Sequence, residues 1–446
     1  MSKTVITLKL WQNIFPALIS HERNVHAFRQ ITEKNEPKRV QLDYDYLFDP
    51  KNTENIERLT QRRKGVGNIR KILNIKEKLS KLQNNAEEYI KIETELENEA
   101  LLIPNQASPH LMNYGEEPCI LEEVNPKPVY NYKPKELHEL AKKLDVLRTD
   151  NLGNLTGHRS YFFKNGLAEM EQALINYTVS YLLTQGFSLI SVPDLLYSDI
   201  IEACGMATRG KRNQSQTISK GVGGCCQLIR TEYVNLKIYS NEKTFEIVDL
   251  GSQLSIVGAS FGGKKIKDDH QSGRYQVHGF TKVEMFGVTD AERHSESHNL
   301  YIQLTQIQKH LFSRLGLHFQ ILDMPHHELG APAYTKTDME AWMPGRAMFG
   351  EISSASNCTD YQSRRLNITY KDENGNIRFA HTVNGTACAI PRTIMAICET
   401  HQQEDGTIAI PEALHQYMAG RKVIEPPNCK NTMSWIKHKI YPGKIL

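Results

Sequence analysis

Cationic side chains that could bind phosphate groups are concentrated between residues 58 and 81. Lysine and arginine bind nucleic acids by displacing the counterions that surround the phosphate backbone. The segment is therefore a candidate nucleic-acid-binding helix. Its cationic residues are Arg58, Arg62, Arg63, Lys64, Arg70, Lys71, Lys76, Lys78 and Lys81.

An acidic segment follows directly and offers a second interpretation. Its carboxylates are Glu87, Glu88, Glu93, Glu95, Glu97 and Glu99. The basic and acidic faces could pair with each other and otherwise be solvated, and the charges alone leave both interpretations open. The formal net charge of +3 over 446 residues is too small to indicate a polyanionic partner.

Cysteine usage gives no sign of a metal or disulfide framework. Of the eight cysteines, Cys225 and Cys226 are adjacent, and no CxxC pair or His/Cys cluster has metal-ligand spacing. We expect reduced thiols, no metal and no cofactor. Hydrophobic residues at 39% and charged residues at 24% are typical of a globular protein. No apolar run approaches the ~18 residues of a membrane span.

Two apolar seams predict that the charged segments form an antiparallel helical hairpin. The 3-4-3 spacing of the first seam is that of a heptad pattern, and Pro104 would end the second helix. Short helices with facing seams pack as antiparallel neighbours. The seams consist of Ile72, Ile75, Leu79 and Leu82, followed by Tyr89, Ile92, Leu96 and Ile103.

The start of the chain is basic and amphipathic. Residues 1–31 contain a single acid, Glu22, and four cations, namely Lys3, Lys9, Arg23 and Arg29. This pattern predicts a mitochondrial targeting segment over residues 1–35, although an ordinary amphipathic first helix has the same composition. We expect the helical arm over residues 36–125 and a core over residues 126–446 that ends in a basic tail.

The core mixes helical and strand-like patterns without a βαβ rhythm. We expect helices over 166–185, ended by Gly186, and over 295–315 and 386–402. Strand-like runs occur at YQVHGF, VEMFGV, HFQILDM, LNITYKD and IRFAHTV, with a hairpin turn at DENGN between the last two. This order favours an α+β fold built on an antiparallel sheet.

Long strings within residues 42–414 resemble mitochondrial seryl-tRNA synthetases. They include VHGFTKVEMFGVT, LGLHFQILDMPHHELGAPAY, GEISSASNCTDYQSRRLNI and HTVNGTACAIPR. The resemblance implies a class II aminoacyl-tRNA synthetase-like antiparallel sheet core with an N-terminal coiled-coil arm that binds tRNA(Ser). The chain resembles still more closely the insect mitochondrial paralogues of this enzyme that lack synthetase activity.

The ATP-binding segment of the family is degenerate in this chain. Where the family has Phe-Arg-x-Glu, this chain has Phe261, Gly262, Gly263 and Lys264, so an α-phosphate donor and an adenine acceptor are missing. Ser272 and Gln276 stand where the family has two further arginines. Loss of one preorganised donor typically costs ~3–4 kcal/mol of transition-state stabilisation. The resemblance therefore implies a pseudoenzyme with no catalytic residues and no ATP binding.

Other pocket positions of the family are retained. Glu284 matches a serine-contacting carboxylate, and Glu351 and Ser354 match ATP and magnesium contacts. Asn384, Thr386 and Arg392 match the rest of the pocket. A structural reason for their retention is also available, because Glu351 and Arg392 could form an ion pair whose loss would be destabilising.

Residues 166–196 resemble the segment that builds the two-fold interface of the family, although a plain amphipathic helix would look the same. The resemblance implies a heterodimer with the genuine mitochondrial seryl-tRNA synthetase in the mitochondrial matrix. It also implies an association with the Lon protease. Two alternatives remain open: an active synthetase with a divergent ATP-binding motif, and a regulator of a mitochondrial protease or of DNA maintenance.

Overall fold

A computed structural model describes the chain over residues 40–63, 67–82, 86–149, 161–191, 195–205, 216–218, 226–228, 253–258, 280–291, 294–372 and 374–427. From Leu42 onward these residues belong to one compact unit. Several predictions lie outside the described residues. They concern the targeting segment over residues 1–35, most of the basic tail, Lys64, and the degenerate positions Gly262, Lys264, Ser272 and Gln276.

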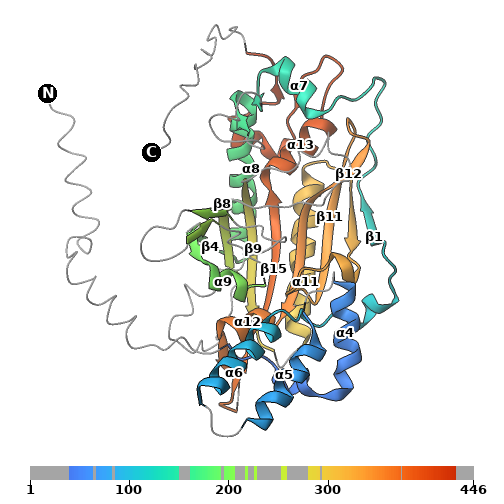
Figure 1. Ribbon diagram of the computed structural model, residues 1–446. Coiled ribbons are helices and arrows are strands. Elements are labelled where there is room, and N and C mark those ends of the chain that lie inside the picture. The colour runs from blue at the N-terminus through green and yellow to red at the C-terminus, as the bar shows by residue number, and fades with distance from the viewer. Residues whose placement is uncertain are drawn as a thin grey trace, which may run out of the picture. The chain divides into compact units, whose positions relative to one another are not determined.

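An eight-stranded sheet forms the centre of this unit (Figure 1). Its strands, in spatial order, are β1 (Cys119–Val124), β10 (Phe319–Asp323), β11 (Thr335–Met343), β12 (Met348–Thr359), β15 (His381–Ala389), β9 (Thr281–Thr289), β8 (Gln253–Gly258) and β4 (Ser188–Ser191). Neighbouring strands are antiparallel except β4 and β8, which are parallel. The expected α+β fold with an antiparallel sheet is confirmed.

Three helices share one apolar core with the sheet. They are α8 (Asn165–Thr184), α11 (His294–Arg314) and α13 (Ile390–Thr400). Met170 of α8, Leu304 of α11 and Ile397 of α13 are fully buried together with Met339 and Val383 of the sheet. Because side chains alternate across a strand, residues between these core positions point to the opposite face. That face carries the candidate site.

The remaining helices and strands complete the described part. They are α3 (Tyr44–Phe48), η1 (Pro50–Asn52), α4 (Thr53–Arg62), α5 (Ile69–Lys81), α6 (Ala86–Leu101), η2 (Pro109–Asn113), α7 (Leu137–Leu144), β2 (Leu147–Arg148), β3 (Phe162–Phe163), β5 (Leu195–Tyr197), α9 (Ser198–Ala203), β6 (Gln216–Ile218), β7 (Cys226–Leu228), η6 (His326–Glu328), α12 (Tyr361–Leu366), β13 (Thr369–Lys371), β14 (Ile377–Phe379), β16 (Ile408–Ala409), η7 (Glu412–Met418) and β17 (Val423–Ile424).

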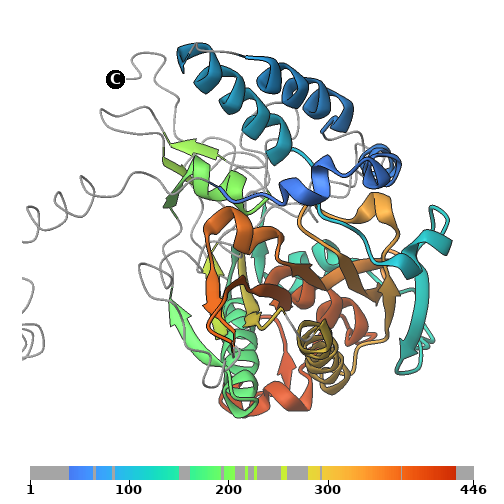
Figure 2. The ribbon, with the colours of Figure 1, turned by 90° about the horizontal axis from the view of Figure 1, so that it is seen from below.

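The predicted helical hairpin is formed by α5 and α6, which lie side by side (Figure 2). Lys71 near the start of α5 pairs with Glu99 near the end of α6 at 2.6 Å, so the helices run antiparallel. Ile72 and Leu96 are buried, which confirms the apolar seam at this end. Tyr89 is 43% exposed, so the seam does not extend to the other end as predicted.

Helix boundaries in the core agree with the sequence in all but one case. Helix α8 ends as expected before Gly186, whose φ of +87° favours glycine. The expected helix over 386–402 was wrong at its start, because β15 continues to Ala389 and α13 begins at Ile390. Ala389 still pairs with Lys282 of β9, and Pro391 fits the first turn of a helix. Pairing with a neighbouring strand thus overrides the helical pattern of residues 386–389.

Candidate active site

Five of the six retained pocket positions lie on neighbouring strands of the sheet. Glu284 is on β9, Asn384 and Thr386 are on β15, and Glu351 and Ser354 are on β12. Thr386 lies directly opposite Glu284 in the pairing of β9 with β15. The sixth position, Arg392, is in the first turn of α13, which follows β15 directly.

Glu284 is at the centre of a buried hydrogen-bonded cluster. Its side chain is 0% exposed and accepts hydrogen bonds from Asn384 Nδ2 at 3.3 Å and Thr386 Oγ1 at 2.9 Å. The ammonium of Lys282 lies 2.8 Å from Glu284 Oε2 and donates to Thr386 Oγ1 at 3.1 Å. A buried carboxylate needs such partners because its own desolvation is costly. A substrate ammonium would have to compete with Lys282 for this carboxylate.

Lys282 was not singled out in the sequence analysis, although a signal for it was present. It stands two residues before Glu284 in the strand, and residues at i and i+2 share one face. An alternation of lysine and glutamate in an otherwise apolar strand predicts a buried ion pair on that face. Both side chains are buried in the structure, as this reading requires.

Arg392 joins α13 to β12. Its Nη1 lies 3.3 Å from Glu351 Oε2 and donates to the Glu351 backbone carbonyl at 3.1 Å. The guanidinium carbon also lies 5.9 Å from the centre of the Phe280 ring. A flat aromatic group stacked on both would need about 7 Å, twice the ~3.5 Å contact distance of carbon atoms. Arg392 or Phe280 would therefore have to move outward by about 1 Å to admit it.

A second ion pair, between the half-buried Lys336 and the buried Asp338 on β11, lies beside β12. Lys336 Nζ is 2.6 Å from Asp338 Oδ1, and Asp338 is opposite Ser354 in the strand pairing. Burial raises the pKa of Asp338 to about 6, while Lys336 opposes this shift and the Glu351 carboxylate adds to it. The alternating sequence TKTDME, at residues 335–340, carries the same signal as the Lys282 and Glu284 pair.

Helix α11 holds the strands of the site together from behind. Gln308 Nε2 donates to the backbone carbonyls of Ser354 and Thr386, each at 2.9 Å. Ser354 itself is half-buried on the site face of β12. The site is thus a row of buried and half-buried cations and carboxylates compensated mainly by one another. No group of three His, Cys, Asp or Glu side chains within the described residues is placed to hold a metal.

The predicted basic surface is largely exposed, but it is compensated by neighbouring groups. Arg70 pairs with Glu57, and Lys81 pairs with Glu77 within α5. Lys71 pairs with Glu99 and lies 3.6 Å from Glu95. Lys76 lies 4.0 Å from the centre of the Phe48 ring. Both interpretations of the charged hairpin thus have support, because exposed ion pairs are weak and can be exchanged for phosphate contacts.

Arg63 does not belong to that surface. Its side chain is 4% exposed, and its guanidinium donates to the backbone carbonyls of Gln106, Gly330, Ala331 and Ala333 at 2.8–3.3 Å. Burial lowers the pKa of Arg63 to about 10, so it remains charged at neutral pH. The sequence interpretation grouped it with the exposed cations because helical charge spacing does not distinguish the two environments.

His326 lies near Arg63, and its pKa predicts how the stability of the fold depends on pH. Burial, together with Arg62, Arg63 and other nearby cations, lowers the pKa of His326 from 6.5 to about 4. The folded state therefore binds this proton less tightly than the unfolded state, and stability is lost as the pH falls from about 6.5 to about 4. Glutamine has no such proton to bind. Between pH 6.5 and 4, the free energy of unfolding of a His326→Gln variant should therefore fall by up to ~3 kcal/mol less than that of the wild type. Parallel unfolding-stability curves against pH would contradict this assignment.

Comparison with known proteins agrees with the fold. Residues 263–401 match the tRNA synthetase class II core domain (G, H, P, S and T). The chain is 39% identical over 336 residues to the mitochondrial serine–tRNA ligase of Mus musculus, covering 75% of this chain and 65% of that protein. It is 37% identical over 339 residues to the serine–tRNA ligase of Borrelia garinii subsp. bavariensis, covering 74% and 78%.

Solved structures show the same similarity. The cytoplasmic serine–tRNA ligase of Naegleria fowleri, in complex with AMP, matches with a TM-score of 0.73 and 26% identity, over 87% of this chain and 99% of that chain. The seryl-tRNA synthetase of Pyrococcus horikoshii, complexed with ATP, matches with a TM-score of 0.71 and 25% identity, over 86% and 100%.

Two further observations concern the extent of the match and the helices of the chain. The chain spans less than two thirds of the length of the mitochondrial proteins of Mus musculus and Bos taurus, namely 65% and 63%. In the described part of the chain, no helix is long and apolar enough to cross a membrane. The identity and coverage shared with the Borrelia garinii protein nevertheless show the family, and the chain belongs to the serine–tRNA ligase family.

Proposed function

We propose that this chain is a non-catalytic member of the family. It binds tRNA(Ser) in the mitochondrial matrix and pairs with the genuine mitochondrial serine–tRNA ligase to support translation, without binding ATP or activating serine. The observation that carries the proposal is the composition of the ATP-binding segment. Gly262, Lys264, Ser272 and Gln276 replace three arginines and one glutamate of the family pattern.

The chemistry of serine activation explains why these replacements matter. Attack on the α-phosphate of ATP gathers negative charge on phosphate oxygens, and fixed guanidinium groups stabilise it by bidentate hydrogen bonds. Neither glycine, serine nor glutamine supplies a charge. Lys264 replaces a hydrogen-bond acceptor with a group that can only donate. Each lost donor typically lowers the rate by about 10²–10³.

The retained residues support this proposal through their structural roles. Glu284 has Lys282 as its ion-pair partner, and Arg392 joins α13 to the Glu351 side chain and backbone. Removing one partner of a buried pair typically costs about 3–5 kcal/mol. Selection for a stable fold therefore suffices to keep these residues after catalysis is lost.

A second candidate function is an active synthetase with a divergent ATP-binding motif. Two observations favour it: the relatives are named ligases, and Thr244 and Glu246 resemble the Thr-x-Glu pattern by which the family holds serine. Both residues lie outside the described part of the chain. Serine-dependent ATP–pyrophosphate exchange separates this candidate from the pseudoenzyme, since only an active enzyme catalyses it.

The partner surface is proposed on the segment that resembles the family's two-fold interface. Leu183 at the end of α8 and Leu189 in β4 are about half exposed, which suits a contact with a second protomer. An association with the Lon protease rests on the resemblance alone. A heterodimer with the active ligase would bring the arm of this chain to the tRNA that the partner charges.

Binding of tRNA should depend on the exposed cations of α5. We expect replacement of Lys71, Lys76, Lys78 and Lys81 by glutamine to weaken binding of tRNA(Ser) by at least 10-fold at low salt. The reason is that each lysine on a phosphate releases condensed counterions, so log K should also fall less steeply with log salt. Fluorescence anisotropy of labelled tRNA over a series of KCl concentrations measures both quantities.

The acidic helix supplies the matched control for this experiment. Replacing Glu87, Glu88, Glu93 and Glu97 of α6 by glutamine changes as many charges on the same hairpin, with the opposite sign. This variant should bind tRNA as tightly as the wild type or more tightly. Equal binding by the lysine variant and the wild type would instead mean that the basic face is only solvated.

A further inference from the structure

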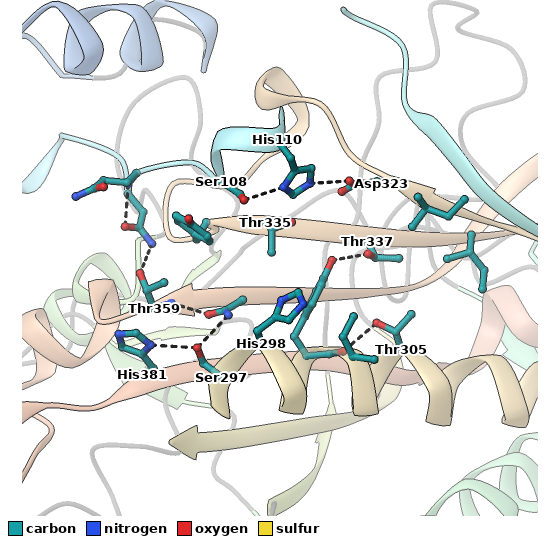
Figure 3. A pocket seen from close by; sticks show the side chains of 18 of the residues that line it. Ser108, His110, Ser297, His298, Thr305, Asp323, Thr335, Thr337, Thr359 and His381 are labelled. Carbon is teal, nitrogen blue, oxygen red and sulfur yellow. Dashed lines mark hydrogen bonds and ion pairs between the residues drawn. The ribbon is translucent and has the colours of Figure 1, made fainter. Parts of the chain in front are cut away.

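A polar cavity of about 860 Å³ lies on the helix-covered side of the sheet, away from the candidate active site (Figure 3). Its walls are the first half of α11, the ends of β10, β11 and β12, and the segment around residues 105–110. None of the retained pocket positions Glu284, Glu351, Ser354, Asn384, Thr386 and Arg392 lines it. Its volume is within the range of small-molecule sites.

Hydroxyl and amide groups form the floor of this cavity. Thr335 and Thr337 of β11, Asn357 of β12 and Ser297 of α11 are all buried. Asn357 Nδ2 donates to Ser297 Oγ at 3.3 Å, and the Thr337 hydroxyl is hydrogen-bonded to Tyr301 (Figure 3). Such groups both donate and accept, so they suit a ligand that carries hydroxyl or amine groups.

Asp323 is the carboxylate that distinguishes the cavity. It is 6% exposed, and its Oδ2 accepts hydrogen bonds from His110 Nε2 at 2.8 Å and Tyr114 at 3.0 Å. Its Oδ1 is buried without a hydrogen-bond partner. A buried acceptor left unpaired destabilises the folded state, and more so if it is charged. A ligand that donates to this oxygen would remove that cost.

The other carboxylates of the cavity are already paired with cations. Glu122 lies 2.6 Å from Lys309, whereas Asp43 and Asp360 lie 3.3 Å and 2.7 Å from Arg364. No lysine or arginine is among the described residues that line the cavity. An anionic ligand would therefore find no fixed positive charge there, whereas a cationic ligand would find Asp323.

We propose that this cavity binds a small organic cation, a molecule with a primary ammonium group and several hydroxyls. The ammonium binds Asp323, whose carboxylate turns about its soft terminal torsion to bring Oδ1 toward the cavity. The hydroxyls bind the buried Thr335, Thr337 and Asn357 groups. Leu121 and Ile302, both exposed at the rim, cover the carbon skeleton. This inference is independent of whether the chain activates serine.

Glucosamine is a suitable probe, because glucose and N-acetylglucosamine have the same ring without the charge. We expect saturable binding of glucosamine to the full chain by isothermal titration calorimetry, at least 10-fold tighter than that of either neutral sugar. Asp323→Asn, which keeps the shape and removes the charge, should weaken glucosamine binding at least 10-fold. Glu116→Gln removes one exposed carboxylate outside the cavity and should leave binding unchanged.

A second variant keeps the test independent of the stability of Asp323→Asn. Ile302 is 43% exposed at the rim, so Ile302→Trp should fold normally while filling the cavity mouth. We expect it also to weaken glucosamine binding at least 10-fold. The proposal is overturned if glucosamine does not bind saturably, if the neutral sugars bind as tightly, or if Ile302→Trp binds like the wild type.

Discussion

Replacement of Arg63 by methionine is expected to destabilise the folded chain by about 3–5 kcal/mol. Methionine retains much of the aliphatic length but removes every hydrogen bond to the carbonyls of Gln106, Gly330, Ala331 and Ala333. These contacts join the end of α4 to the loop that precedes β11 and to the segment that follows α6. Their loss removes the Arg63 donors from the Gln106 and Ala333 carbonyls at the junction of arm and core, whereas the Gly330 and Ala331 carbonyls keep backbone donors. Thermal unfolding of the purified variant measures the effect.

Arg62 provides the control for this prediction. It directly precedes Arg63 as the last residue of α4, and its side chain is exposed. Arg62→Met makes the same chemical change where water can replace the lost contacts, so it should cost less than about 0.5 kcal/mol. Equal stability of the two variants would show that the carbonyl contacts of Arg63 contribute nothing to the fold.

Replacement of Lys282 by methionine should be similarly destabilising, by about 3–5 kcal/mol, because it leaves the Glu284 carboxylate buried without its cation. The Lys282→Met, Glu284→Gln double variant should recover much of this loss. A neutral amide can still bond Asn384 and Thr386, and no uncompensated charge remains. The measurement is a double-mutant cycle, in which the unfolding free energies of both single variants and of the double variant are compared with that of the wild type.

The exposed pair of Lys309 and Glu122 is the matched control. These side chains are 2.6 Å apart, close to the 2.8 Å of Lys282 and Glu284, but both are partly exposed, so the corresponding single variants should each cost less than about 1 kcal/mol. Additive losses for Lys282 and Glu284, with no recovery in the double variant, would contradict a compensated buried pair. The comparison also separates a structural role from a catalytic one, because it does not depend on activity.

Local patterns predicted much of this fold. The apolar spacing of α8, the stop at Gly186 and the DENGN turn between β13 and β14 each follow from residues close in sequence. The end of β15 could not be predicted in this way, because the pairing of Ala389 with Lys282 joins segments about a hundred residues apart. Strand pairing of this kind is decided by tertiary contacts rather than by propensity.

The site was predictable only where a motif fixes neighbouring positions. Glu284, Asn384 and Thr386 do come together, as the resemblance implied. The sequence analysis did not predict that Lys282 pairs with Glu284. It also did not predict that Arg63 is buried. The sequence did not distinguish Arg63 from the exposed cations beside it. Most of its hydrogen-bond acceptors are backbone carbonyls within residues 330–333, and no side-chain pattern in the sequence marks them. Backbone acceptors are used wherever buried donors need them, whatever the local sequence.

The measurement that tests the central claim most directly is serine-dependent ATP–pyrophosphate exchange on the full chain, with an active serine–tRNA ligase assayed beside it. Each of the three missing arginines should lower the rate of serine activation by a factor of about 10² or more. We therefore predict no exchange above background. A variant with Gly262→Arg, Lys264→Glu, Ser272→Arg and Gln276→Arg restores the family pattern and tests whether these positions are responsible. Exchange by the unmodified chain, dependent on serine, would contradict the pseudoenzyme account and establish an active synthetase.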